Sequence, residues 1–189
     1  MKIPQLALAC LIAIGCLATW SLPQAVAEKL QIASRSSKIH FVGSKPAGRH
    51  TGGFQTFTGS FDPDAGQLSL NIDMRSLFTD DRKLTRHLMS PDFFDVRKFP
   101  TATFVASQIR EEQNEGATHV IVGKLTLHGV TRQLTIPCQM TWQGKSLLTS
   151  GKVTLSRSEF GISYGQGQIH EQVPVTFHLV ATPAADGSP

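Results

Sequence analysis

Cysteine is scarce in this chain, and its placement excludes a disulfide framework. Two of the three cysteines, Cys10 and Cys16, lie in an apolar N-terminal stretch, and only Cys138 lies beyond it. If that stretch is removed, no intramolecular disulfide can form, so the domain must be stable through packing and sheet hydrogen bonds. Cys138 alternates with Ile136 and Met140, which predicts a buried small apolar residue and not a reactive thiol.

Clustered charge is also missing. The chain has 18 Lys and Arg against 14 Asp and Glu, and the basic residues form no run. Nucleic-acid binding requires clustered basic residues with aromatic stacking faces, so we predict no nucleic-acid partner. The mild positive excess allows only a transient contact with an anionic membrane.

The longest apolar run has the form of a secretory signal peptide. Lys2 gives a small positive start, Leu6–Trp20 is apolar, and Ala25–Ala27 is an A-x-A cleavage site. The run is shorter than the about 20 residues of a membrane-spanning helix. We predict cleavage after Ala27, giving a periplasmic or secreted protein. The alternatives are an uncleaved anchor and a lipoprotein acylated on Cys16.

Beyond the leader, the hydrophobic pattern has a period of two and predicts an all-β domain over residues 28–181. The tail, residues 182–189, is small and polar and is expected to be disordered. The alternation predicts eight strands, at residues 38–42, 57–61, 68–73, 103–109, 119–127, 130–142, 147–156 and 173–181.

A short helical insertion interrupts these strands between the third and the fourth. Thr79–Asp81 can cap a helix whose apolar side includes Leu84 and Leu88, and Ser90 can start a second one. Eight antiparallel strands with one insertion favour an up-and-down barrel, although alternation alone leaves a sandwich open. It also leaves open whether the centre is hollow or filled by side chains.

Residues Gly161–Gly165 match G-x-S-x-G, the nucleophile elbow of hydrolases. The elbow requires a helix after the serine, and here a glycine-rich loop follows. Glu171 and His178 would be the other members of a triad, but they lie close together and His178 falls inside a predicted strand. A small esterase using Ser163 therefore remains only an alternative.

No metal site or cofactor is predicted. The seven histidines show none of the spacings typical of metal ligands, so solvated or hydrogen-bonded histidines are expected, and convergence across a barrel is the alternative. They are His40, His50, His87, His119, His128, His170 and His178.

Three segments resemble the YceI family of bacterial lipid-binding proteins: Arg86–Phe104, Gly123–Thr131, and Leu155–Ile162, which is followed after a loop by Val173–Thr176. The resemblance extends from about Ser37 to Ala181. It implies an exported, lipocalin-like antiparallel barrel that is not an enzyme and needs no cofactor. The implied ligand is one long apolar chain, such as an isoprenoid quinone, a polyprenyl chain or a fatty-acid derivative.

Side-chain alternation then predicts which residues contact that chain, with Asp80–Asp95 as a lid. The head group is expected to meet Arg82, Arg86 or His87. A ligand-free structural barrel is the alternative, and the protein is expected to be a monomer or a homodimer. The predicted lipid-binding residues are Phe41, Phe57, Leu70, Ile72, Leu84, Leu88, Phe93, Phe94, Phe99, Phe104, Ile121, Leu125, Leu134, Ile136, Trp142, Val153, Leu155, Phe160, Ile162 and Phe177.

Overall fold

The computed structural model describes residues 29–32, 34–63, 65–114 and 116–184, so the predicted signal peptide lies outside the described residues. The described residues form strands β1 (Leu30–Ile32), β2 (Lys38–Lys45), β3 (Gly48–Phe54), β4 (Phe57–Asp62), β5 (Gln67–Asp73), β6 (Leu77–Thr79), β7 (Thr101–Asn114), β8 (Ala117–Leu127), β9 (Val130–Gln143), β10 (Ser146–Ser156) and β11 (Gln172–Pro183). Their helices are α1 (Arg82–Leu88) and the 3-10 helices η1 (Ser34–Ser36), η2 (Met74–Ser76) and η3 (Arg157–Phe160).

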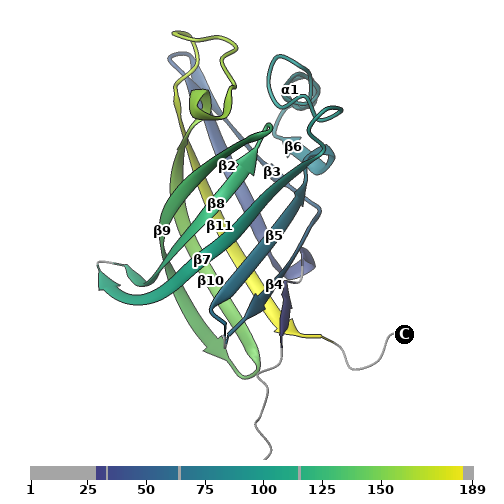
Figure 1. The fold of residues 1–189 in the computed structure, drawn as a ribbon. Coiled ribbons are helices and arrows are strands. Elements are labelled where there is room, and N and C mark those ends of the chain that lie inside the picture. Colours follow the sequence, from purple (N-terminus) through teal and green to yellow (C-terminus); the bar gives the residue numbers. More distant parts are fainter. Residues whose placement is uncertain (1–28, 33, 64, 115, 185–189) are drawn as a thin grey trace, which may run out of the picture.

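Eight of these strands close into an antiparallel barrel (Figure 1). The ring runs β1-β4-β5-β7-β8-β9-β10-β11 and returns to β1, whose Leu30–Ile32 pair with residues 181–183. This closure confirms the predicted eight-stranded barrel and excludes the sandwich. Because β11 continues through Thr182 and Pro183, the first two residues of the predicted disordered tail are in fact part of the barrel wall.

The two halves of β11 have different neighbours. Its C-terminal end pairs with β1, while Val175–His178 pair with β2, which continues the sheet into β3 and β6. The sequence predicts β2 as a member of the ring and does not predict β1, β3 or β6. β1 and β6 are only three residues long, and Gly48, Gly52 and Gly53 give β3 the composition of a loop.

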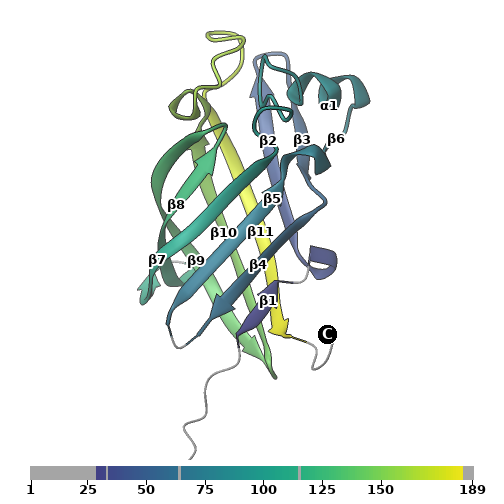
Figure 2. The same cartoon turned by 45° about the vertical axis from the view of Figure 1, so that its right-hand side comes forward.

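Helix α1 lies between β5 and β7, which are the third and fourth predicted strands, at one end of the barrel (Figure 2). Asp81 is its N-cap and accepts a 2.7 Å hydrogen bond from the Leu84 amide, as predicted. The second helix predicted at Ser90 does not form. Residues 90–99 fold into successive turns instead, with Asp95 at a positive φ of 42° and Pro100 ending the segment.

A tight hairpin turn at His128 and Gly129 joins β8 and β9. His128 and Gly129 have φ values of 52° and 76°, the left-handed conformation that a two-residue type I′ turn requires at both positions. The Phe99 side chain lies against Gly129, where any β carbon would be 2.6 Å from the ring.

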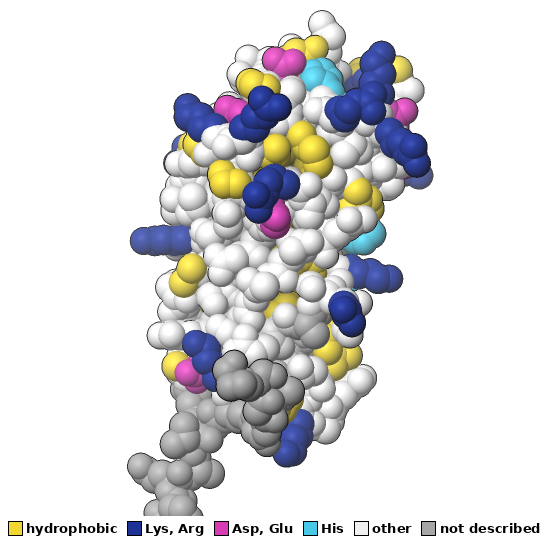
Figure 3. All heavy atoms as spheres, turned by 90° about the vertical axis from the view of Figure 1, so that its right-hand side faces the viewer, with side chains coloured by type: hydrophobic (Ala, Val, Ile, Leu, Met, Phe, Trp, Pro, Cys, Tyr) yellow, Lys and Arg dark blue, Asp and Glu magenta, His cyan; other side chains and the backbone are white. Residues whose placement is uncertain are grey.

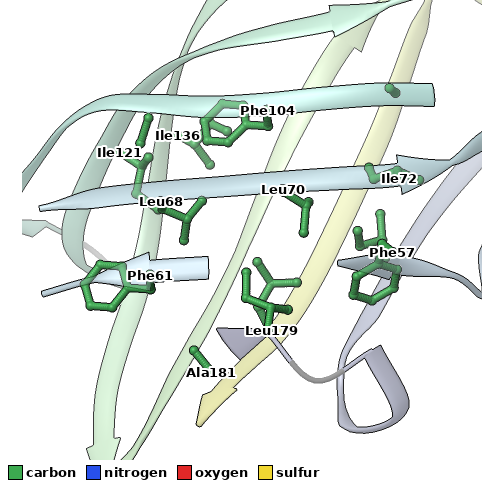
Figure 4. Packing of buried hydrophobic residues seen from close by; sticks show 14 of the residues in the cluster. Phe57, Phe61, Leu68, Leu70, Ile72, Phe104, Ile121, Ile136, Leu179 and Ala181 are labelled. Carbon is green, nitrogen blue, oxygen red and sulfur yellow. The ribbon is translucent and has the colours of Figure 1, made fainter. Parts of the chain in front are cut away.

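The end of the barrel closed by β1 is packed solid. Phe61, Leu147 and Ala181 are buried there, at 6%, 2% and 4% exposure, and inward side chains of β5, β7 and β11 face one shared space next to them (Figure 4). A second buried cluster lies at the opposite end, beneath α1 and η3, and contains Leu77, Phe93 and Phe160. None of the helices in the described part of the chain is long and apolar enough to cross a membrane.

Candidate ligand-binding cavity

The barrel encloses a cavity of about 480 Å³, lined in part by residues of both buried clusters. This volume lies within the range of pockets that hold small molecules, about 300–1,000 Å³. Its wall is formed by apolar side chains from β2, β5, β7, β8, β9, β10 and β11. The sequence left a hollow centre and a filled one equally open, and the structure shows the hollow one.

The hollow explains why several inward-facing side chains are only half-buried. Leu134, Val153, Leu155 and Phe177 lie on the inward faces of their strands, yet none is fully buried. Their free surface faces the cavity, since the outward positions beside them carry polar residues such as Thr154.

Polar residues that line the cavity belong mainly to the end near α1. They are Ser44, Lys45, His50, His87, Arg157, Tyr164 and Gln168. Lys45, Tyr164 and Gln168 are exposed to solvent as well, so the cavity opens at this end. We call this end the mouth.

Three segments surround the mouth, and a histidine lies at each contact between them. The β2–β3 hairpin contacts the loop 161–171 where Ser44 Oγ lies 3.1 Å from His170 Nδ1. The hairpin contacts the residues before α1 where His50 Nδ1 lies 2.8 Å from Asp80 Oδ1. Helix α1 contacts the loop through stacked rings. Backbone hydrogen bonds accompany the first two contacts, since His170 N donates to Ser44 O at 2.9 Å and Asp80 N donates to Thr51 O at 3.0 Å.

The stacked rings are those of His87, Phe93 and Tyr164. Their centroids lie 4.9–5.0 Å apart, with His87 edge-on to both of the others. Edge-to-face rings at this separation attract each other by about 0.5–1.5 kcal/mol beyond their burial. His87 Nε2 also lies 3.0 Å from Asp92 Oδ2, which fixes the orientation of the imidazole.

Arg157 organises the loop that forms one side of the mouth. Its side chain is only 6% exposed, and Nη1 donates to the backbone oxygens of Ile162 and Tyr164 at 3.2 and 2.6 Å. Nη2 donates to Ile169 at 3.4 Å. Arg157 Nε has no hydrogen-bond partner among the described residues, and Glu171 Oε2 lies 3.8 Å away, close enough only for Coulombic attraction.

Two carboxylates at the mouth are held in the ionised form. The hydroxyl of Ser156, and next Ser158, lower the pKa of Glu171 from 4.5 to about 2, because they donate hydrogen bonds to the charged carboxylate. The backbone amide of Thr51, and next His50, lower the pKa of Asp80 in the same way. Both carboxylates therefore remain negative near neutral pH.

Most of the predicted lipid-binding residues line the cavity. The list comprises Phe41, Leu70, Ile72, Leu84, Leu88, Phe93, Phe94, Phe104, Ile121, Leu125, Leu134, Ile136, Val153, Leu155, Phe160, Ile162 and Phe177. His87, a predicted head-group residue, also lines it. That these residues contact a lipid remains a prediction.

Five of the predicted residues lie elsewhere. Phe57 is buried in the core without lining the cavity, Phe99 lies against the Gly129 turn, and Trp142 is 53% exposed near the β9–β10 turn. Trp142 has the inward parity of its strand and pairs with the buried Leu147, yet it does not line the cavity. Arg82 and Arg86 project from α1 into solvent and do not line the cavity.

Several lining residues were missed. Val173, Val175 and Leu179 share the inward parity of Phe177 on β11, and Ile39 shares that of Phe41, so the alternation was sufficient to find them. Lys45 and Tyr164 lie next to or in loops, where no period relates sequence to orientation, and His50 lies in β3, whose glycines conceal the strand in the sequence. No sequence signal pointed to them.

The hydrolase motif lacks its structural context. Residues 163–168 form turns and no helix, and Ser163 does not line the cavity. His178 lies in β11 on the face opposite Phe177, and among the described residues no hydrogen bond joins it to Ser163 or Glu171. Within the same part of the chain, no three His, Cys, Asp or Glu side chains gather as metal ligands would.

A closed antiparallel barrel around an apolar cavity with one open end defines a small β-barrel of the ligand-enclosing type. The YceI-like domain model matches residues 30–181, so the chain belongs to the YceI family.

Individual relatives agree with this assignment. A UPF0312 protein of Pseudomonas aeruginosa strain LESB58 is 33% identical over 133 residues, which cover 65% of this chain and 68% of the relative. The crystal structure of Burkholderia cenocepacia BcnA is 28% identical, with a TM-score of 0.71, over 80% of this chain and 99% of that one.

A polyisoprenoid binding domain from Saccharophagus degradans, implicated in plant cell wall breakdown, has a TM-score of 0.68. The match covers 82% of this chain and 98% of that domain at 17% identity, so it shows a shared fold alone.

Proposed function

We propose that this chain is an exported carrier that holds one long apolar chain, such as an isoprenoid quinone, a polyprenyl chain or a fatty-acid derivative. The observation that carries the proposal is the 480 Å³ cavity, lined by apolar side chains along its length and polar only at the mouth. The polyisoprenoid binding domain that shares the fold supports the same ligand class.

The energy gained by burying such a chain is comparable to the cost of binding it, which corresponds to weak or useful affinity. Burial of an alkyl chain contributes about 0.8 kcal/mol per CH₂, so sixteen carbons offer roughly 13 kcal/mol. Loss of translational and rotational freedom and related costs oppose this by about 4–15 kcal/mol. Apolar burial alone discriminates weakly between chains of similar length, so polar groups at the mouth would select the head group.

The mouth supplies candidates for head-group contact. His87 lines the cavity, as do Lys45 and Tyr164, and these side chains offer hydrogen-bond donors where the cavity meets solvent. Helix α1 and the turns after it would act as the lid, since Leu84, Leu88 and Phe93 cover the cavity from above.

Export and membrane contact are part of the same proposal. The leader supports export, because it combines Lys2, the apolar run Leu6–Trp20 and the Ala25–Ala27 site. Lys and Arg side chains gather over the end that carries α1, among exposed apolar side chains (Figure 3). That charge favours a transient contact between the mouth and an anionic membrane.

Native mass spectrometry of protein purified from its own host, followed by organic extraction, tests the proposal. We expect one apolar molecule per protein chain. Protein that is empty after repeated gentle preparations would instead support the ligand-free barrel.

The variant Ser163→Ala distinguishes a carrier from the alternative, a small esterase that uses Ser163. A carrier retains its ligand and shows no change in background hydrolysis of a chromogenic ester, whereas an esterase loses that activity.

A further inference from the structure

The wall of the barrel is broken between β9 and β10. The ladder that joins these strands ends at the pair Cys138 and Gly151. Beyond that pair the strongly curved β9 (Figure 1) continues beside β8, and β10 continues beside β11. The structure describes residues 130–137 and 152–156 completely, and no backbone pairing joins these two stretches. Backbone hydrogen bonds therefore do not close this part of the wall.

The break runs along the cavity. Leu134 and Ile136 on its β9 side line the cavity, and so do Val153 and Leu155 on its β10 side. The β10 side consists of residues 152–156, which at about 3.4 Å per residue span roughly 17 Å. Over this length side chains, and not a ladder, separate the interior from solvent.

The 3-10 helix η3 covers the end of the break that is farthest from the ladder. It follows β10 directly and lies against β9. Its Phe160 is 1% exposed and belongs to the buried cluster against which Val130 of β9 and Leu155 of β10 pack. Helix η3 thus bridges two strands that are no longer paired.

One side-chain hydrogen bond fixes η3 to the β8–β9 turn. His128 Nδ1 lies 3.1 Å from the backbone oxygen of Phe160. A carbonyl oxygen can only accept, so this contact requires the proton on Nδ1. The His128 ring packs against Phe99 at 4.5 Å and does not line the cavity. Loss of this hydrogen bond would therefore release η3 without altering the cavity wall.

We propose that the break is a lateral portal for the apolar ligand, with η3 as its gate and the hydrogen bond from His128 to Phe160 as its latch. The inference rests on the proposed carrier function and adds the route of entry and exit. A long chain that leaves sideways moves by about its own width. Through the mouth the same chain would have to be drawn out over its whole length.

The hydrogen bonds also favour the lateral route. At the mouth, the backbone amides of His170 and Asp80 donate to carbonyls of the β2–β3 hairpin. Among the described residues, no backbone hydrogen bond joins η3 to β8 or β9. Displacing η3 therefore breaks fewer hydrogen bonds than separating the segments around the mouth.

Residue 128 allows a matched test of the latch. Asn and Asp both tolerate the positive φ of His128, and both suit a type I′ turn before a glycine. The amide of Asn can donate from nearly the position of Nδ1, whereas the carboxylate of Asp can only accept. His128→Asp therefore removes the latch, and His128→Asn retains it in a side chain of the same shape.

The test follows uptake and release of cis-parinaric acid, a fluorescent long-chain fatty acid, by delipidated protein in a stopped-flow instrument. We expect His128→Asp to raise both rates by about 5- to 30-fold, the range for a partly buried carbonyl that loses its donor. The Kd should stay within about twofold of the wild-type value, because a gate changes the barrier and not the two end states. His128→Asn should keep wild-type rates.

His170→Ala is the control for the mouth. The His170 side chain lies beside Ser44 of the β2–β3 hairpin and does not line the cavity. The lateral route predicts wild-type rates in this variant. Wild-type rates in His128→Asp, or faster rates in His170→Ala, would overturn the inference. A higher Kd in His128→Asp without faster uptake would also overturn it, because this result would show damage to the fold and not an opened gate.

Failure of the carrier proposal gives a different result, since delipidated wild-type protein then binds no probe. The gate is still tested by Val153→Cys in a Cys138→Ala background, which places a single thiol at the cavity beside the break. A water-soluble maleimide should label this thiol about 5- to 30-fold faster with His128→Asp than with His128→Asn. Equal labelling rates would overturn the gate.

Discussion

Single polar side chains hold the mouth in place. Arg157 is buried and crosslinks three backbone oxygens of the loop 161–171, while Glu171 receives hydrogen bonds from Ser156 and Ser158. The sequence contains both residues, but nothing in it shows that a buried guanidinium organises the loop. A loop that lacks regular hydrogen bonds needs such side-chain donors to satisfy its carbonyls.

The Glu171 contacts predict a dependence of stability on pH. The folded-state pKa of about 2 lies below the ordinary 4.5. The carboxylate therefore contributes stability that is complete above about pH 4.5 and is lost as the pH falls toward 2. Urea unfolding at pH 7 and pH 3 should show a smaller loss of unfolding free energy on acidification in Glu171→Gln than in the wild type. An equal loss in both proteins would contradict this assignment.

The pKa of the Cys138 thiol is shifted upward, which predicts low reactivity of this side chain in the folded protein. Burial raises the pKa of its thiol to about 11, and its residue is only 2% exposed. A thiolate is the reactive form, so a thiol reagent at pH 8 should leave the native protein almost unlabelled and modify it fully in denaturant. Rapid labelling of native protein would show that this part of the wall opens easily. Cys138→Ser, which has no thiol, is the control for nonspecific reaction.

Among the secondary-structure elements, α1 depends on its cap because it has only seven residues. Asp81→Ala removes the acceptor of the Leu84 amide and should weaken the first turn by about 1 kcal/mol. The Leu84 amide should then exchange with solvent about fivefold faster, measured by NMR. Asp81→Asn retains a capping oxygen and should exchange near the wild-type rate. Equal exchange in the two variants would show that the cap does not limit opening.

The β9–β10 ladder stops partway along the barrel. Pairing runs from the β9–β10 turn to the pair Cys138 and Gly151. The next residue of β9, Pro137, has no amide hydrogen to donate. Beyond this point β9 pairs only with β8, and β10 only with β11. We expect the backbone amides of residues 130–136 that donate no hydrogen bond to β8 to exchange with solvent faster than the amides of residues 139–143, as measured by hydrogen exchange. Uniform protection along β9 would contradict the break.

For the whole molecule, a ligand in the cavity should raise thermal stability. At a hundred times its Kd, a ligand that binds only the folded state adds about 2.7 kcal/mol. For a domain of this size each kcal/mol raises Tm by about 2–4 °C. Hexadecanoic acid should produce this shift in delipidated protein, while butanoic acid, which buries little apolar area, should produce none. Equal shifts with both acids would indicate a general effect of carboxylates on the surface.

The sequence predicts the ring of strands well because one period, alternation, governs both strand formation and the direction of each side chain. It finds Phe177 and Leu70 as inward residues for that reason. It fails at β3, where glycines accommodate rings from neighbouring strands, and at Lys45 and Tyr164, which lie outside any regular period. Contacts between loops that are distant in sequence form only in the closed barrel, so they cannot be predicted from the sequence of either loop alone.

The pairing of β1 with the last residues of β11 joins the two ends of the domain, since Leu30 lies opposite Pro183. A chain emerging from the ribosome or a translocon cannot complete this pairing until its final strand is free. Contacts between residues so distant in sequence also form slowly. The interior is consequently enclosed only after the last strand of the domain is available, so a partly synthesised chain cannot hold a molecule inside a closed barrel.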